Sequence, residues 1–211
     1  MKYTKFCICI SGLDGTGKSR IVDELIKYYK KNYKIKHIWS RYKNYSSKPL
    51  LFFTRIIGLN YKIKKKNITI GYHDFHKSIT ISFLFLFFQW IDQVIEIFIK
   101  FRLSKKNIIS DRSILDTLVD LAVDTKLENF IFSIYGKSLF KLMPKNTFFF
   151  ILKRDFKKIK KNRKDVFIDK NLDRRIYLYE KISHLFPIVI IENNYKLKNT
   201  LNIIKSKLKL K

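Results

Sequence analysis

The chain has 211 residues, of which 46% are hydrophobic and 29% are charged, and its formal net charge is +28. This composition excludes a disordered chain, and the length favours one domain over residues 1–211. The charge would suit a polyanionic partner such as a nucleotide, a nucleic acid or an anionic membrane. Because lysine is spread along the whole chain, a general bias in residue usage is the simpler explanation, and nucleic acid is the less favoured partner.

The first predicted element is a short apolar run at residues 6–10, which is typical of a buried parallel strand. Cys7 and Cys9 are two residues apart in this strand, so they point to the same face and do not readily form a disulfide. Nothing indicates an oxidising compartment, and the apolar run is too short for a signal peptide. We therefore expect a cytoplasmic protein with two buried thiols.

The letters GLDGTGKS follow this strand at residues 12–19, and a helical pattern covers residues 17–31. They match the phosphate-loop pattern G-x-x-x-x-G-K-[ST] in its expected setting between a strand and a helix. Glycines let backbone N–H groups turn toward an anion, and the helix N-terminus adds a favourable dipole. Lys18 would reach the β- and γ-phosphates of ATP, and the Ser19 hydroxyl would ligate Mg²⁺. The predicted ATP-binding residues are Gly12, Leu13, Asp14, Gly15, Thr16, Gly17, Lys18 and Ser19.

The next elements are a strand at 34–40, a helix at 46–58, a basic polar loop at 60–71 and a long apolar helix at 79–101. The long helix nearly has the length of a membrane span, but four polar residues interrupt it. We therefore expect a largely buried helix with one polar face and no insertion into a membrane. Asp92 and Gln93 on that face are candidate contacts for a base or a sugar, because polar groups on an apolar helix need partners.

The rest of the chain alternates between strands and helices. Strands are predicted at 107–110, 146–152 and 188–191, and helical segments at 113–125, 128–142, 172–185 and 197–208. Residues 155–162 are expected to form a basic helix or a mobile segment. Alternation of this kind predicts an α/β fold with a five-stranded parallel sheet and helices on both faces. Ligands of such sheets bind beyond the carboxyl ends of the strands. Gly12, Asp111 and Arg154 each follow a predicted strand, so we expect them at one edge of the sheet.

Asp111 and Arg112 come directly after the third strand. Asp111 could hold magnesium or its waters, and Arg112 could bind a second phosphate group. The alternative is an aspartate that caps the next helix beside a structural arginine. No NKxD sequence for guanine is present. His73, Asp74 and His76 lie close together in the sequence, but no third and fourth ligand accompany them, so no transition-metal site is expected.

Together these segments resemble the thymidylate kinase family, and most closely the archaeal thymidylate-kinase-like proteins. The likeness rests on the phosphate loop, on HIWSRYKNYSSKPLL, GYHDFHKS and SDRSILDTLVDLAVD, and on the basic stretch RDFKKIKKNRKD. It runs from about residue 5 to residue 193. It implies a P-loop nucleoside-monophosphate-kinase fold with an acceptor-binding helical region at about 46–103 and a short lid at about 155–165.

The resemblance also implies roles for single residues. Asp14 matches the family's acidic loop residue that contacts the acceptor's sugar, and Arg41 matches the arginine that binds the acceptor's phosphate. Asp111 and Arg112 match the family's Asp-Arg pair, and Arg163 in the lid matches a catalytic arginine, since the loop itself has none. The predicted catalytic residues are thus Lys18, Asp111, Arg112 and Arg163. The predicted acceptor contacts are Asp14, Arg41, Asp92, Gln93 and Arg112, and the predicted magnesium ligands are Ser19 and Asp111.

The chain departs from the family at three places. Ser113 stands where the family has a tyrosine after the Asp-Arg pair, and Arg20-Ile21 replaces the usual threonine-glutamine pair. Residues 118–124 read LVDLAVD, in place of the motif that supplies a glutamine near the base.

The leading hypothesis is ATP- and Mg²⁺-dependent transfer of a phosphoryl group to a nucleoside monophosphate, with dTMP as the first candidate. A kinase for a hydroxyl acceptor such as a deoxynucleoside is the second hypothesis, in which Asp111 or Asp14 would have to serve as the base. The third is a nucleotide-binding ATPase associated with nucleic acid, for which only the charge of +28 argues. The resemblance also implies a homodimer built through long apolar helices.

Overall fold

In the computed structural model, residues 5–41, 43–65, 68–184, 186–194 and 196–208 are described. Their centre is a five-stranded sheet with the strand order β2-β5-β1-β6-β7, in which every neighbouring pair is parallel. The predicted α/β sheet is therefore confirmed. The strands are β1 (Cys7–Ser11), β2 (Ile35–Trp39), β5 (Asn107–Asp111), β6 (Thr147–Lys153) and β7 (Ile188–Glu192).

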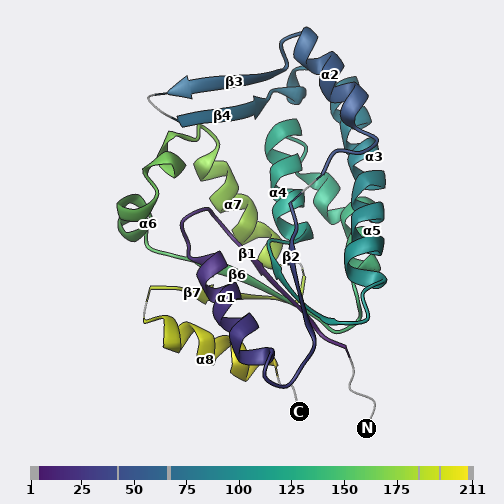
Figure 1. The fold of residues 1–211 in the computed structure, drawn as a ribbon. Coiled ribbons are helices and arrows are strands. Elements are labelled where there is room, and N and C mark those ends of the chain that lie inside the picture. The colour runs from purple at the N-terminus through teal and green to yellow at the C-terminus, as the bar shows by residue number, and fades with distance from the viewer. Residues whose placement is uncertain (1–4, 42, 66–67, 185, 195, 209–211) are drawn as a thin grey trace.

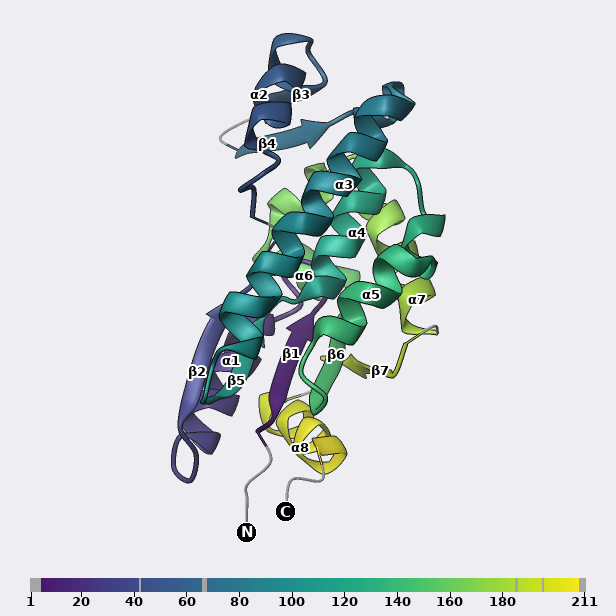
Figure 2. The same cartoon turned by 90° about the vertical axis from the view of Figure 1, so that its right-hand side faces the viewer.

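Helices cover both faces of this sheet (Figures 1 and 2). The helices of the described residues are α1 (Lys18–Tyr29), α2 (Lys48–Ile56), α3 (Ile79–Glu96), α4 (Ile114–Thr125), α5 (Ile134–Leu142), α6 (Phe156–Asn162), α7 (Leu172–Ser183) and α8 (Leu197–Leu208). Shorter 3₁₀ turns lie at Phe75–Lys77, Asn129–Phe132 and Lys164–Ile168, and a π-helical segment, Ile97–Arg102, continues α3. The single helix predicted at 128–142 is interrupted because extended Ser133 caps α5, accepting the N–H of Tyr135 at its hydroxyl.

The alternation of side chains along β1 divides the interior into two cores. Cys7 and Cys9 face the core formed with α4, α5, α7 and the end of α3, whereas Ile8 and Ile10 face the core formed with α1 and α8. Both thiols are free and fully buried, with their sulfur atoms 3.7 Å apart, as the sequence predicts.

A β-hairpin occupies the segment that the sequence analysis expects to be a loop. β3 (Asn60–Lys65) and β4 (Ile68–His73) pair in antiparallel fashion and form a separate two-stranded sheet above the main one (Figure 1). The prediction of a loop at 60–71 is therefore wrong. Tyr61 and Ile63 alternate with Lys62 and Lys64, a period of two that suits a strand, and the density of lysine obscured it.

The long helix is apolar enough, and at 24 residues (Ile79–Arg102) long enough, to cross a membrane by length and composition, and 44% of its most apolar window is buried in the protein. Its polar residues Gln89, Asp92, Gln93 and Glu96 are all at most 2% exposed. Burial of these groups against protein agrees with the expectation of a core helix, and the absence of membrane insertion stays a prediction.

Asp92 does not act as the predicted acceptor contact, because the start of α2 uses its carboxylate. The backbone N–H groups of Tyr45, Ser46 and Ser47 donate to it at 3.0, 2.7 and 3.3 Å, and the Ser47 hydroxyl donates at 2.8 Å. Gln93 is buried beside it, and its side-chain nitrogen has no partner within the described residues. Neither residue lines the cavity described below. Asp92 therefore anchors α2.

Replacing Asp92 with alanine is expected to lower the free energy of unfolding by about 2–4 kcal/mol, since four buried or partly buried donors lose their acceptor. Burial alone would raise the pKa of Asp92, but the hydrogen bonds from Ser46, Ser47 and Tyr45 outweigh it and lower the pKa. This stabilisation is therefore complete above about pH 4 and is lost as the pH falls through the lowered pKa. Urea unfolding at pH 7 and at lower pH measures it. A loss below about 0.5 kcal/mol in the alanine variant would contradict the assignment.

Candidate active site

The glycine-rich segment between β1 and α1 wraps around the side chain of Lys18. The ammonium group donates to the backbone oxygens of Gly12 at 2.8 Å and Leu13 at 2.7 Å, and lies 3.6 Å from the Asp14 carboxylate. Lys18 is only 6% exposed, and this burial, with the nearby charge of Arg112, lowers its pKa. The loop thus holds one buried cation at the centre of a ring of backbone, as a phosphate-binding loop does.

Two glycines in this loop are required by their surroundings. Gly12 has φ +131°, and a Cβ on it would lie 2.5 Å from the backbone oxygen of Leu152 in β6. Gly15 has φ +84°, and a Cβ there would lie 2.9 Å from Ile159 and 3.3 Å from the Cβ of Arg163. α6 and the residue that ends it therefore pack directly on the phosphate loop. This is the place that the sequence assigns to the lid and to Arg163.

The Ser19 hydroxyl and the Asp111 carboxylate meet at the base of the loop. Oγ of Ser19 donates to Oδ2 of Asp111 at 2.5 Å, which brings the end of β5 and the start of α1 together. A hydroxyl beside a carboxylate offers oxygen ligands of the kind that Mg²⁺ prefers, and that ion takes most of its other ligands from water and phosphate. The described residues contain no cluster of three or more His, Cys, Asp or Glu for a metal. These two oxygen donors fit the predicted magnesium role.

Arg112 links the loop to α4 and has an unusual backbone. Its φ of 73° lies in the left-handed region, which non-glycine residues rarely adopt. This conformation turns the guanidinium back so that it pairs with Asp14 in the loop and with Asp116 in α4. Burial alone would raise the pKa of Asp14, but Arg112 and Lys18 bring it below its usual value. The loop carboxylate is therefore ionised and fixed between two cations.

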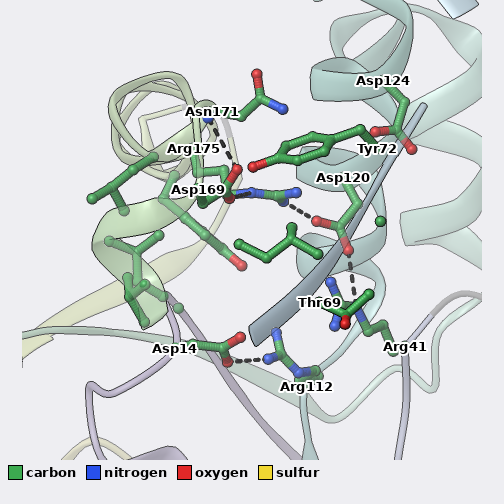
Figure 3. A pocket seen from close by; sticks show the side chains of 17 residues that line it. Asp14, Arg41, Thr69, Tyr72, Arg112, Asp120, Asp124, Asp169, Asn171 and Arg175 are labelled. Atoms are coloured by element: carbon green, nitrogen blue, oxygen red, sulfur yellow. Dashed lines mark hydrogen bonds and ion pairs between the residues drawn. The ribbon is translucent and has the colours of Figure 1, made fainter. Parts of the chain in front are cut away.

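A cavity of about 330 Å³ opens from the phosphate loop and Arg112 (Figure 3). Its volume is within the range of small-molecule sites. α4, the hairpin strand β4 and the segment from residue 166 into α7 form its other walls. The charged residues that line it are Asp14, Arg41, Arg112, Asp120, Asp124, Asp169 and Arg175. The predicted acceptor residues Asp14, Arg41 and Arg112 thus meet at one cavity.

Three carboxylates on α4 border this cavity or its arginines, and the sequence analysis missed them. Asp116, Asp120 and Asp124 are four residues apart and at most 7% exposed, so they form one row on the helix. Asp116 accepts from the Tyr179 hydroxyl at 2.7 Å as well as from Arg112. The four-residue spacing of these aspartates is visible in the sequence. Like the polar residues of the long helix, it places on one face of an apolar helix polar groups that need partners.

The other two carboxylates of the row hold cavity residues in place. Asp120 pairs with Arg41 at 3.2 Å and with Arg175 of α7, and Arg175 also pairs with Asp169 at 3.0 Å. Asp124 bonds His73 of β4 at 2.8 Å. Arg41 and Arg175 are therefore already held in fixed orientations at the cavity. Each is paired with a carboxylate, so an anionic ligand would have to displace that carboxylate or bind the arginine together with it.

Comparison with solved structures identifies the fold. A thymidylate kinase from Ehrlichia chaffeensis aligns over 97% of this chain and 99% of its own, with a TM-score of 0.58 and 15% sequence identity. A deoxyadenosine kinase from M. mycoides with bound dATP aligns over 96% and 99%, with a TM-score of 0.51 and 17% identity. The fold is that of the P-loop nucleoside kinases. No protein-family model and no curated protein matches the sequence.

In this P-loop kinase fold, Arg154 and Asn193 flank the phosphate loop on the side of β6 and β7. Arg154 donates to the backbone oxygen of Gly15 at 3.5 Å. The Asn193 amide donates to the backbone oxygen of Thr16 at 2.7 Å and accepts from the Thr200 hydroxyl at 2.8 Å. Gly12, Asp111 and Arg154 do meet at one edge of the sheet, as their positions after strands predict. Asn193 follows β7 in the same way and was missed.

Lys170 joins the hairpin to the segment between α6 and α7. Its ammonium group donates to the Tyr61 hydroxyl at 2.9 Å and pairs with Asp74 at 3.1 Å, and it lies 4.5 Å from the centre of the Tyr72 ring. The hairpin thus closes one wall of the cavity through a charged contact.

Loss of this contact is expected to loosen the hairpin. In a Lys170→Met variant, the amide protection factors of β3 and β4 should fall about tenfold at pH 7 while those of β1 stay unchanged. Burial alone would raise the pKa of Asp74, but Lys77, Lys170 and Tyr61 lower it to about 2. In the wild type the hairpin should therefore lose protection only as the pH falls from about 4 toward 2. Hydrogen exchange followed by NMR measures both effects, and equal protection in the variant would contradict the contact's role.

Proposed function

We propose that this chain transfers the γ-phosphoryl group of ATP to a nucleoside monophosphate, with dTMP as the leading acceptor. The observation that carries this proposal is the position of the phosphate loop at the mouth of a cavity that contains three arginines. The names of the two solved neighbours, a thymidylate kinase and a deoxyadenosine kinase, add support for a nucleotide or nucleoside as acceptor. We likewise propose that the chain is related to the archaeal thymidylate-kinase-like proteins that its sequence resembles.

The charges of the site suit the meeting of two phosphate groups. In the proposed reaction an oxygen of the acceptor phosphate attacks the γ-phosphorus of ATP, the bond to the β-phosphate oxygen breaks, and ADP leaves. Two anions must approach each other, and Lys18, Arg112 and Arg41 would offset their repulsion. Arg163 would add charge from the lid. Mg²⁺, when held through Ser19 and Asp111, would neutralise charge on the β- and γ-phosphates.

The state of Asp14 favours a phosphate acceptor over a hydroxyl acceptor. A phosphate group is already a nucleophile, whereas a hydroxyl group needs a base to remove its proton. Asp14 is the carboxylate of the phosphate loop itself, and its lowered pKa makes it a weak base. Asp111, the other candidate, accepts the Ser19 hydroxyl. Transfer to the hydroxyl group of a deoxynucleoside is therefore the second candidate function. It is supported by the name of one solved neighbour, a deoxyadenosine kinase.

Rates of transfer from Mg-ATP test the proposal across acceptors. Purified protein is assayed with each deoxynucleoside and each deoxynucleoside monophosphate, and kcat/KM is measured by ADP release with product chromatography. We expect diphosphates to form from monophosphates at least about tenfold more efficiently than monophosphates from nucleosides. Preference for nucleosides would support the second candidate. ATP hydrolysis without any transferred phosphate would overturn both, and salt-sensitive DNA binding would then favour the ATPase hypothesis.

A further inference from the structure

Backbone groups are unpaired along the β4 edge of the β3–β4 hairpin, and one hydrogen bond shows which residues they belong to. The N–H of Asp74 donates to the backbone oxygen of Leu59 at 2.8 Å, so these residues form a hydrogen-bonded pair of the ladder. In an antiparallel ladder, bonded pairs alternate with non-bonded pairs. Counting back from Asp74, Tyr72 and Ile70 bond to β3. The backbone groups of the residues that alternate with them, Thr69, Gly71 and His73, point away from β3.

Of these three residues, Thr69 and Gly71 are the two that lie at the cavity. Both residues line the cavity of about 330 Å³. In the part of the chain that the structure describes, the hairpin sheet has only two strands, so no third strand pairs with this edge of β4. Within the described residues, no backbone or side-chain group hydrogen-bonds to either backbone. Each residue therefore offers one N–H donor and one C=O acceptor to a ligand.

β4 lies on the side of the cavity away from the main sheet, whose edge carries the phosphate loop and Arg112 (Figure 1). Thr69, near the start of the strand, lines this cavity together with Arg41 and Arg112 (Figure 3). At the other end of the strand, His73 bonds Asp124 at 2.8 Å. Gly71 therefore lies beyond the arginines that would hold an acceptor phosphate. A nucleotide whose phosphate contacts Arg41 and Arg112 would bring its base toward Gly71.

The backbone conformation at position 71 does not require a glycine. Its φ is not positive, and a Cβ on it would meet no atom within 4 Å. Glycine in a strand costs stability, and it is found where a ligand or another backbone approaches closely. Gly71 also borders a second hollow, of about 700 Å³, between the hairpin and α2. At Gly71, therefore, only main-chain atoms lie between the cavity of about 330 Å³ and the hollow of about 700 Å³.

We propose that the free edge of β4 reads the acceptor's base through the main chain, with the N–H and C=O of Gly71 pairing with the base. This inference rests on the proposed function. The ligand group is a heterocycle that carries a hydrogen-bond donor next to an acceptor, which thymine and the other bases present on one edge. Thr69, the next free residue, contacts the part of the acceptor nearer the phosphate.

Proline substitutions test this assignment, because proline at a non-bonded edge position removes the free N–H without breaking the ladder. Gly71→Pro removes the N–H that faces the cavity. Lys64→Pro is the matched control, since Lys64 also sits in a non-bonded pair but on the outer edge of the hairpin and lines neither hollow. Gly71→Ala adds a Cβ in open space and is expected to raise Tm slightly while it hinders close approach.

Two ligands, dTMP and 2-deoxyribose 5-phosphate, separate recognition of the base from recognition of the phosphate. Calorimetric Kd values are measured for both with each variant. We expect Gly71→Pro to weaken dTMP about tenfold and deoxyribose 5-phosphate less than about twofold, and Lys64→Pro to change neither. Gly71→Ala should weaken dTMP alone. Equal losses for both ligands, or unchanged dTMP affinity in the two Gly71 variants, would overturn the inference. Failure of the wild type to transfer phosphate overturns the proposed function instead, because these measurements need no turnover.

Discussion

Lys18→Met is expected to lower kcat for phosphoryl transfer by about a hundred- to a thousandfold and to weaken Mg-ATP binding. The ammonium group is buried within the loop, where it contacts the backbone oxygens of Gly12 and Leu13. Methionine is unbranched like lysine and one atom shorter, so the main loss is that of the ammonium group, with its charge and its hydrogen bonds. Steady-state kinetics and the Kd of Mg-ATP measure the two effects.

Lys27→Met is the matched control, since Lys27 is on the same helix but its side chain is 73% exposed. It should leave kcat and Tm unchanged. Circular dichroism and thermal unfolding check that the Lys18 variant is folded. If Lys18→Met retained more than half of the wild-type kcat, the loop would not be the site of the reacting phosphates.

Arg112→Lys is expected to lower kcat/KM for the acceptor by about a hundredfold. Lysine keeps the positive charge but loses the planar fork, which allows arginine to hold Asp14 and Asp116 at once. An acceptor phosphate would therefore lose both a donor and the orientation of the loop carboxylate. The KM of the acceptor should rise and kcat should fall, whereas the KM of ATP should change little.

Arg102→Lys provides the comparison for this substitution, because Arg102 donates only to exposed backbone oxygens of residues 141 and 142. Its kinetic constants should equal those of the wild type. A fall in Tm of the Arg112 variant without any change in the acceptor's KM would show that Arg112 serves the fold alone.

Much of the site could be predicted because its signals are local. The phosphate loop is one continuous motif, and Asp111 and Arg112 follow a strand whose apolar run is easily recognised. Parallel topology then brings their strand ends to one edge. Arg41 and Arg163 were placed by resemblance, and the structure puts Arg41 in the cavity and Arg163 against the loop.

What the sequence did not predict depends on contacts between distant segments. The hairpin needs β4 to pair with β3, and Lys170 to join it from 100 residues away, neither of which a local pattern reveals. Asp92 was expected to contact the acceptor, but α2 uses it, because a buried carboxylate pairs with the nearest free backbone donors. The role of the carboxylates on α4 can be recognised only from their partners Arg41, Arg175 and His73, which come from other segments of the chain.

The central claim, that a triphosphate in the loop faces an acceptor phosphate held by arginines, can be tested with one ligand. A compound that joins adenosine to thymidine through five phosphates would occupy both positions at once, as a reacting pair does. We expect calorimetry with Mg²⁺ to give a Kd at least about a hundredfold below that of ATP, and Arg112→Lys to remove most of this gain. A Kd no lower than that of ATP would contradict the account.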